Sequence, residues 1–125
     1  MEEFGTVLQC MDGRPQGKVA AYLSVVFRVR HLDTITTAGL VRHLASETDQ
    51  TPILLANLDI SLTAHGSQRV AVVAHHDCAG NPISDEQQKQ QVADAVGRLS
   101  TIHPEAEFVG LWVNEHWTVE EVTRI

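Results

Sequence analysis

The sequence predicts a single three-layer α/β domain over residues 1–125, with a mainly parallel central sheet of four or five strands and helices on both faces. Short apolar runs alternate with stretches of helical periodicity, which is typical of strand–helix–strand units. Residues 70–74 are apolar throughout, as expected for a strand covered on both sides. A chain of 125 residues, 43% of them hydrophobic, supports one ordinary core and is too short for two.

The first part of the chain is expected to form two strands and two helical segments. Residues 4–8 indicate a buried strand that ends close to Cys10, and residues 17–27 carry apolar side chains at helical spacing. Residues 34–37 are β-branched and predict a second short strand. A helical turn is expected over residues 40–45.

A longer helix is predicted to begin at Thr51. This threonine is suited to be the N-cap, and Pro52 to fill the first helical position, where no N–H is needed. One apolar face follows before Gly66 and consists of Leu54, Leu55, Leu58 and Leu62. The buried strand at residues 70–74 comes next.

The last part of the chain is expected to add a helix and two strands. Ser84 and Gln87 form a capping-box pattern, and apolar residues at helical spacing continue from there to Ile102. Residues 108–113 predict a fourth strand, and residues 118–122 a fifth strand or a hairpin partner.

Charge and composition exclude several classes of partner. The net charge of -7 argues against binding to nucleic acid or to an anionic membrane, since both require a basic surface. No apolar run approaches the roughly 20 residues of a spanning helix, and the amino terminus lacks the pattern of a signal peptide. A cytoplasmic protein is therefore expected, and its two cysteines are expected to be free, metal-bound or catalytic.

Both cysteines follow apolar strands, and a histidine accompanies the second one. Cys10 comes after the first strand, while His75 and Cys78 come after the third. If these strands are neighbours in a parallel sheet, the three side chains meet beyond its carboxyl edge. Two thiolates and one imidazole suit Zn²⁺, which leaves a fourth position for water or a side chain. Buried cysteines that pack as small apolar residues are the simpler alternative.

Asp12 is the nearest carboxylate to this predicted zinc site, and Arg14 is placed to pair with it. A bidentate grip by Arg14 would keep Asp12 ionised and turned away from the metal. Zinc would then generate a hydroxide near neutral pH, which Asp12 could orient toward an electrophilic carbon. If Asp12 instead binds the metal, the Cys2HisAsp site is closed and the protein is a non-catalytic zinc-binding or regulatory protein.

These motifs resemble those of β-class carbonic anhydrases. CMDGR at residues 10–14 is similar to the C-x-D-x-R motif of that family, and HHDCAG at residues 75–80 to its H-x-x-C-G turn. Residues 53–78 also resemble the helix and strand that lead into the second motif, so the resemblance spans most of residues 4–80. It implies a zinc lyase that hydrates CO₂ reversibly, with Cys10, His75 and Cys78 as ligands and Asp12 and Arg14 as the gatekeeping pair.

The resemblance also implies a homodimer built along a sheet edge. Only nine residues precede Cys10, so the helical amino-terminal region that clasps the partner in that family is expected to be missing. The family's arginine-asparagine signature after the second strand is not found in residues 31–44. The substrate is expected to be a small molecule, with CO₂ or bicarbonate, CS₂ and COS as alternatives.

Other polar and aromatic residues receive simpler interpretations. His76 is expected to lie behind the ligands or in solvent, and Asp77 to orient an imidazole or face water. Trp112 and Trp117 are assigned to the core or to a dimer contact. The scattered histidines are expected at the surface: His31, His43, His65, His103 and His116. Gln16 stands where a thiol phosphatase needs arginine, and the patterns of zinc deaminases and C-x-x-C redox proteins are absent.

Overall fold

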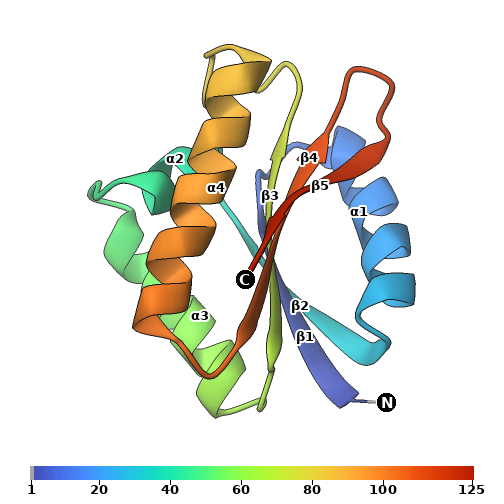
Figure 1. The fold of residues 1–125 in the computed structure, drawn as a ribbon, viewed down its shortest axis with the longest axis vertical. Helices are drawn as coiled ribbons and strands as arrows, with labels where there is room; N and C mark the ends of the chain where they lie inside the picture. The colour runs from blue at the N-terminus through green and yellow to red at the C-terminus, as the bar shows by residue number, and fades with distance from the viewer. Residues whose placement is uncertain (1) are drawn as a thin grey trace.

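A five-stranded sheet runs through the middle of the computed structural model, which describes residues 2–125 (Figure 1). Its strands are β1 (Glu2–Gln9), β2 (Val29–Thr36), β3 (Arg69–His75), β4 (Glu107–Val113) and β5 (Val119–Arg124). They lie in the order β2-β1-β3-β4-β5, and all neighbouring pairs are parallel except β4 and β5. The predicted α/β class with a mainly parallel sheet is confirmed, and β5 is a hairpin partner of β4.

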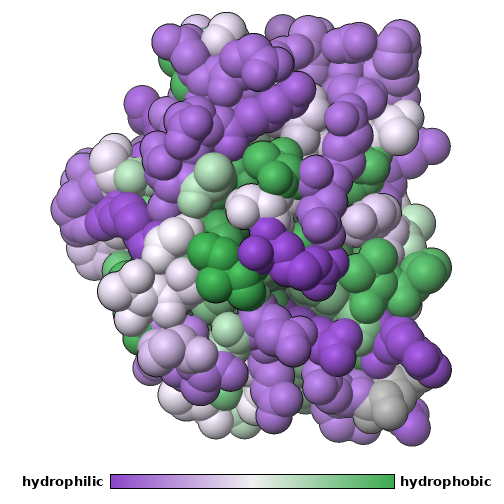
Figure 2. Space-filling view, in the orientation of Figure 1, coloured by the Kyte–Doolittle hydropathy of each residue, from purple (hydrophilic) through white to green (hydrophobic). Residues whose placement is uncertain are grey.

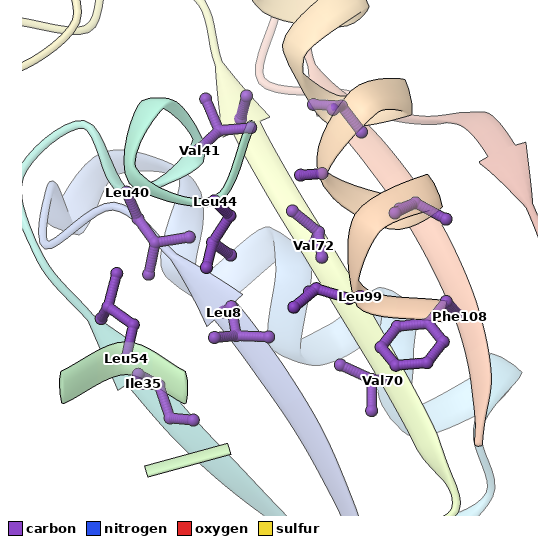
Figure 3. Packing of buried hydrophobic residues seen from close by; sticks show 14 of the residues in the cluster. Leu8, Ile35, Leu40, Val41, Leu44, Leu54, Val70, Val72, Leu99 and Phe108 are labelled. Atoms are coloured by element: carbon purple, nitrogen blue, oxygen red, sulfur yellow. The ribbon is translucent and has the colours of Figure 1, made fainter. Parts of the chain in front are cut away.

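Helices cover both faces of this sheet (Figure 1). Helix α1 (Gly13–Val26) lies on one face, and α2 (Leu40–Ala45), α3 (Thr51–Thr63) and α4 (Asp85–Ile102) lie on the other. The larger of two buried clusters gathers Leu8, Val70 and Val72 of the sheet with Leu44 of α2 and Leu99 of α4 (Figure 3). The smaller cluster joins the alternate strand residues to α1, so successive side chains face opposite helix layers.

The visible surface carries both hydrophilic and hydrophobic residues. Figure 2 shows hydrophilic residues over the upper end of the visible face and hydrophobic residues across its middle. Among the helices of the described residues, none is both long enough and apolar enough to cross a bilayer.

The starts of β2 and α1 differ most from the predictions. Strand β2 starts at Val29 rather than at residue 34, because it is an edge strand whose mixed polar and apolar residues are only partly covered. Helix α1 starts at Gly13 rather than at residue 17, because the Asp12 carboxylate accepts the Arg14 N–H and caps the first turn.

The start of α3 and the position of His43 also differ from the predictions. Gln50 is the N-cap, and Thr51 lies in the first turn, where its hydroxyl donates to the His43 carbonyl at 2.6 Å. His43 was expected at the surface, but its residue is only 2% exposed. The six-residue helix α2 is too short for its sequence to show a buried face, yet α2 packs against α4 with His43 turned inward.

The carboxyl ends of β1 and β3 lie side by side. β1 pairs with β2 on one side and with β3 on the other. The chain passes from β1 to β2 in one direction across the sheet and from β3 to β4 in the opposite direction, so the strand order reverses between β1 and β3. The loop that follows β2 also reaches this place, because a Cβ atom at Gly80 would lie only 2.7 Å from the Gly39 nitrogen. Three loops therefore surround one point at the switch in strand order.

Candidate metal centre

Cys10 lies directly after β1 and is buried at this switch point. Its Sγ accepts the backbone N–H of Gly39 at 3.4 Å and that of Asp12 at 3.5 Å. Two N–H donors aimed at one sulfur favour the thiolate over the thiol. The loops after β1 and β2 thus each direct a backbone N–H at the Cys10 sulfur, which would suit an anionic ligand.

His75 is the last residue of β3 and is 2% exposed. Its Nδ1 lies 2.8 Å from the His76 carbonyl, which requires Nδ1 to carry the proton and leaves a lone pair on Nε2. That Nε2 is buried and has no hydrogen-bond partner among the described residues. A buried, unpaired acceptor is costly unless another group binds it, and a metal ion is one group that binds such a nitrogen.

Cys78 completes the group from the turn after β3. Its Sγ lies 3.8 Å from the Cys10 Sγ, and the two sulfurs and a ring nitrogen of His75 all lie within 4.8 Å of one another. Two thiolates bound about 2.3 Å from a tetrahedral zinc ion are separated by about 3.8 Å. The predicted residues are therefore brought together at a spacing that fits Zn²⁺ without rearrangement of the backbone.

Without a metal, the interaction between the two cysteines shifts their pKa values in opposite directions. The hydrogen bond from Cys78, opposed by burial and supported by His75 and the backbone donors, lowers the pKa of Cys10. The same shared proton and burial raise the pKa of Cys78. Burial opposes protonation of His75, but its interactions with Cys10 and the His76 carbonyl raise its pKa overall. A divalent cation would replace the shared protons and bind both sulfurs as thiolates.

Asp12 and Arg14 form a forked ion pair beside this group. Arg14 Nη2 lies 2.7 Å from Asp12 Oδ2, and Nε lies 3.2 Å from Oδ1 and 3.1 Å from Oδ2. These hydrogen bonds lower the pKa of Asp12 to about 2, so the carboxylate is ionised at neutral pH. Its Oδ2 is 4.0 Å from His75 Nε2, close to the point where the three ligand atoms converge.

Arg14 makes three further contacts, with two residues. Its Nη1 lies 3.2 Å from Asp77 Oδ2, and its Nη2 lies 2.9 Å from the Asp77 carbonyl. Its guanidinium carbon also lies 4.9 Å from the centre of the Trp117 ring. Asp77 was expected to orient an imidazole or to face water; its side chain is exposed to water and also accepts a hydrogen bond from Arg14.

His76 contributes to the site through its backbone. Its carbonyl fixes the tautomer of His75, whereas its ring lies 3.0 Å from both carboxylate oxygens of Asp85. The prediction that His76 lies behind the ligands agrees with this arrangement. His76, Asp85 and Glu115 form a second, more exposed group of possible ligand residues at the same end of the sheet.

A cavity of about 280 Å³ opens beside the candidate ligands. Its lining consists of Cys10, Met11, Asp12, Ala38, Ala79 and Gly80. Apart from the Asp12 carboxylate and one thiol, these side chains are small or apolar. Ala79, which separates Cys78 from Gly80 in the sequence, contributes to this lining. The space suits a small molecule with little polarity.

Comparison with known families agrees with this geometry. A family model described as "Putative carbonic anhydrase" matches residues 1–123. The chain belongs to this carbonic anhydrase family. The predicted resemblance to β-class carbonic anhydrases is thereby confirmed, and it extends past residue 80 to nearly the whole chain. A search of curated proteins finds no match.

Solved carbonic anhydrases share the fold at low sequence identity. The enzyme from Glaciozyma antarctica is 16% identical, with a TM-score of 0.67 over 94% of this chain and 81% of that one. β-Carbonic anhydrase isoform I from Trichomonas vaginalis is 13% identical, with a TM-score of 0.65 and the same two shares. A tetrameric β-carbonic anhydrase from Sordaria macrospora is 10% identical, with a TM-score of 0.63 over 100% and 84%.

Three residues around the carbonic anhydrase-like site were missed by the sequence reasoning. Gln16 Nε2 donates to the Cys10 carbonyl at 3.2 Å, and the buried Gln88 Nε2 donates to the His75 carbonyl at 3.0 Å. Trp117 contacts Arg14. Gln88 lies four residues before Val92 on the buried face of α4, so helical periodicity could have placed it. Nothing in the sequence indicates the contact between Trp117 and Arg14.

Proposed function

We propose that the protein catalyses the zinc-dependent hydration of CO₂ or a similar small electrophile. One observation carries the proposal: two buried thiols and a buried, unpaired imidazole nitrogen converge at the spacing of a tetrahedral zinc site. Membership of the carbonic anhydrase family supports the same reaction. Cys10, His75 and Cys78 hold the metal, and zinc, when bound, supplies the acidity that brings a water molecule's pKa to about 7.

Asp12 and Arg14 have separate tasks in this proposal. Asp12 stays a carboxylate because its pKa is held at about 2, so it can only accept a hydrogen bond. It accepts a hydrogen bond from the attacking oxygen and thereby turns the lone pair of that oxygen toward the substrate. Arg14 keeps both carboxylate oxygens engaged and so holds Asp12 away from the ligands.

The cavity supports a small, linear substrate. Ala38, Ala79 and Gly80 offer no side-chain donor to recognise a polar group, and Met11 adds an apolar, flexible wall. CO₂, COS and CS₂ all match this description. Membership of the carbonic anhydrase family favours CO₂ among them.

Stopped-flow CO₂ hydration by zinc-loaded protein tests the proposal. Wild-type protein is expected to bind one zinc ion and to hydrate CO₂, whereas Cys10→Ser loses the metal and the activity together. Asp12→Asn keeps the metal, because asparagine also caps α1, but lowers the rate by about a hundredfold. A wild-type rate equal to that of Cys10→Ser would exclude catalysis.

A closed, non-catalytic zinc site is the second candidate. The 4.0 Å separation between Asp12 Oδ2 and His75 Nε2 favours it, because a small movement of the carboxylate would make Asp12 a fourth ligand. A crystal structure of the zinc-loaded protein at neutral pH distinguishes the two. Water or an anion in the fourth position supports the enzyme, and an Asp12 oxygen there supports the closed site.

A cytoplasmic homodimer completes the proposal. Cys10 and Cys78 are both free, as expected in a reducing compartment. The outer side of β2 is an open sheet edge that a second copy can pair with. Light scattering at micromolar concentration is expected to give twice the mass of 13.8 kDa, and a monomer would contradict the assembly.

A further inference from the structure

We propose that Asp77 and Trp117 are positioning residues that hold Arg14 in place and thereby keep Asp12 off the metal. The inference rests on the proposed metal site and adds what determines whether that site is open. It concerns two residues on separate loops: Asp77 lies in the turn between two ligands, and Trp117 lies in the β4–β5 hairpin.

The Arg14 guanidinium has an acceptor at each of its three nitrogens. Nε bonds Asp12, Nη1 bonds the Asp77 side chain, and Nη2 is divided between the Asp12 carboxylate and the Asp77 carbonyl. The Trp117 ring adds a cation–π contact at 4.9 Å. Arg14 therefore cannot follow Asp12 toward the metal without losing its contacts with both Asp77 and Trp117.

The backbone of the two positioning residues is unusual. Within residues 2–125, positive φ occurs at three non-glycine residues: Arg28, Asp77 and Trp117. Two of these three contact Arg14, with φ angles of 58° at Asp77 and 59° at Trp117. Such conformations persist where surrounding contacts hold them, as at functional sites. Asn114 supplies one such contact, because its side chain accepts the N–H groups of His116 and Thr118 and its carbonyl accepts that of Trp117.

Whether the proposed site is open or closed depends on a small displacement of the Asp12 carboxylate. Asp12 Oδ2 is already 4.0 Å from His75 Nε2, so Asp12 needs to move little to reach a metal held by that nitrogen. What opposes the movement is the loss of the Arg14 hydrogen bonds, and those bonds are strong only while Arg14 stays in position. Weakening the hold on Arg14 therefore shifts the site toward the closed form.

If Asp77 acted on the metal directly through its charge, its removal would change the affinity for an anion in the opposite direction to that expected from the positioning role. Removing a nearby negative charge would by itself strengthen the binding of an exogenous anion at the metal. The positioning role predicts that the same change weakens anion binding, because Asp12 then competes for the fourth position. The direction of the change in affinity thus separates the two explanations.

Azide binding to the cobalt-substituted protein is the test, followed by the visible absorption of the metal. Asp77→Asn is expected to fold, because asparagine tolerates positive φ. This variant is expected to raise the azide Kd about threefold. Trp117→Leu is expected to raise it about fivefold, and Trp117→Phe by less, since phenylalanine retains a weaker ring contact. In an Asp12→Ala background both effects are expected to vanish, because no competing carboxylate remains.

Glu121→Gln is the matched control. Glu121 is an exposed carboxylate in β5 that contacts Arg124 rather than Arg14 and belongs to neither group of possible metal ligands, so its removal is expected to leave the Kd unchanged or slightly lower. Circular dichroism checks folding, and if Trp117→Leu does not fold, Asp77→Asn and Trp117→Phe decide the matter. An Asp77→Asn Kd equal to that of Glu121→Gln, or an unchanged effect in the Asp12→Ala background, would overturn the inference.

The outcome is separable from that of the proposed function. Wild-type protein that shows no thiolate-to-cobalt absorption would overturn both the metal site and this inference. The expected azide pattern without CO₂ hydration would remove the catalytic proposal and leave the roles of Asp77 and Trp117 standing.

Discussion

A single ring nitrogen carries much of the functional interpretation. His75 Nε2 is buried and has no hydrogen-bond partner among the described residues, although the other ring nitrogen and the backbone carbonyl of His75 are both hydrogen-bonded. The His76 carbonyl and the Gln88 amide fix the ring and the backbone of His75 from behind. The protein thus maintains an acceptor in an environment where an unused one would reduce stability.

His43 yields a prediction about pH at the residue scale. Burial, and secondarily the Arg42 charge, hold the pKa of His43 below its usual 6.5, so the unfolded chain binds more protons than the folded one as the pH falls through that value. Stability contributed by neutral His43 is therefore present above pH 6.5 and is lost below it. Urea unfolding between about pH 7 and about pH 5 is expected to show a steeper loss for wild type than for His43→Gln.

His116→Gln provides the control for that comparison, because it removes an exposed imidazole from the β4–β5 hairpin. Its free energy of unfolding is expected to follow the wild-type pH dependence. Identical slopes for wild type and His43→Gln would contradict the burial of His43.

The sequence located the candidate ligands but not the residues that support them. Cys10, His75 and Cys78 are recognisable because metal-ligating residue types follow apolar strands at both positions. Trp117 and Gln16 act through contacts between loops or through a single turn, and such contacts leave no periodic pattern. His43 was assigned to the surface for the same reason, since a six-residue helix has too few turns to show which face is buried.

At the scale of single elements, α4 shows the closest agreement between sequence and structure. The Ser84 hydroxyl accepts the Gln87 N–H at 3.1 Å, and the Gln87 side chain accepts the Ser84 N–H at 3.1 Å, which confirms the capping box. The buried residues Val92, Ala95, Val96 and Leu99 follow at the predicted spacing. Local signals suffice here because the capping box marks where the helix starts and the spacing of the apolar residues marks its buried face.

Ser84→Ala is expected to lower the free energy of unfolding by about 1 kcal/mol, because both reciprocal hydrogen bonds at the start of α4 depend on the serine. Urea denaturation followed by circular dichroism measures the change. Thr101→Ala, an exposed substitution in the last turn of the same helix, is expected to stay within about 0.5 kcal/mol of wild type. Equal effects of the two substitutions would show that the cap contributes nothing specific.

The first residues of strands and helices were harder to predict. In β2 the first five residues are partly solvated, so their mixed polarity resembles that of a loop. In α1 the first turn contains Gly13 and Pro15, which are unfavourable inside helices but acceptable at a start that Asp12 caps. Tertiary position, rather than local preference, determined both boundaries.

For the whole molecule, strand order is the property that makes the site. Short-range patterns predict the strands but do not reveal which strands are neighbours, so the meeting of Cys10 with His75 and Cys78 was conditional until the order β2-β1-β3-β4-β5 was known. The parallel pairing of β1 with β3 then brings the two loops together.

Zinc is expected to stabilise the whole fold, because its ligands meet only when β1 and β3 are paired. At a free zinc concentration a thousandfold above Kd, the free energy of unfolding is expected to rise by about 4 kcal/mol. Calorimetry with zinc and with a chelator tests this, because a larger free energy of unfolding appears as a higher Tm. Cys10→Ser serves as the control, and an equal zinc-dependent rise in that variant would contradict the site.

The separation of 68 residues between the two sulfurs has a consequence during biosynthesis. At about 5–20 residues per second, Cys10 leaves the ribosome roughly 3–14 seconds before Cys78. The nascent chain therefore presents a solitary thiol for that interval, and any oxidant or foreign disulfide that reacts with it would prevent assembly of the proposed centre. If the proposed site holds zinc, the ion can bind only after translation has delivered β3 and the turn that follows it.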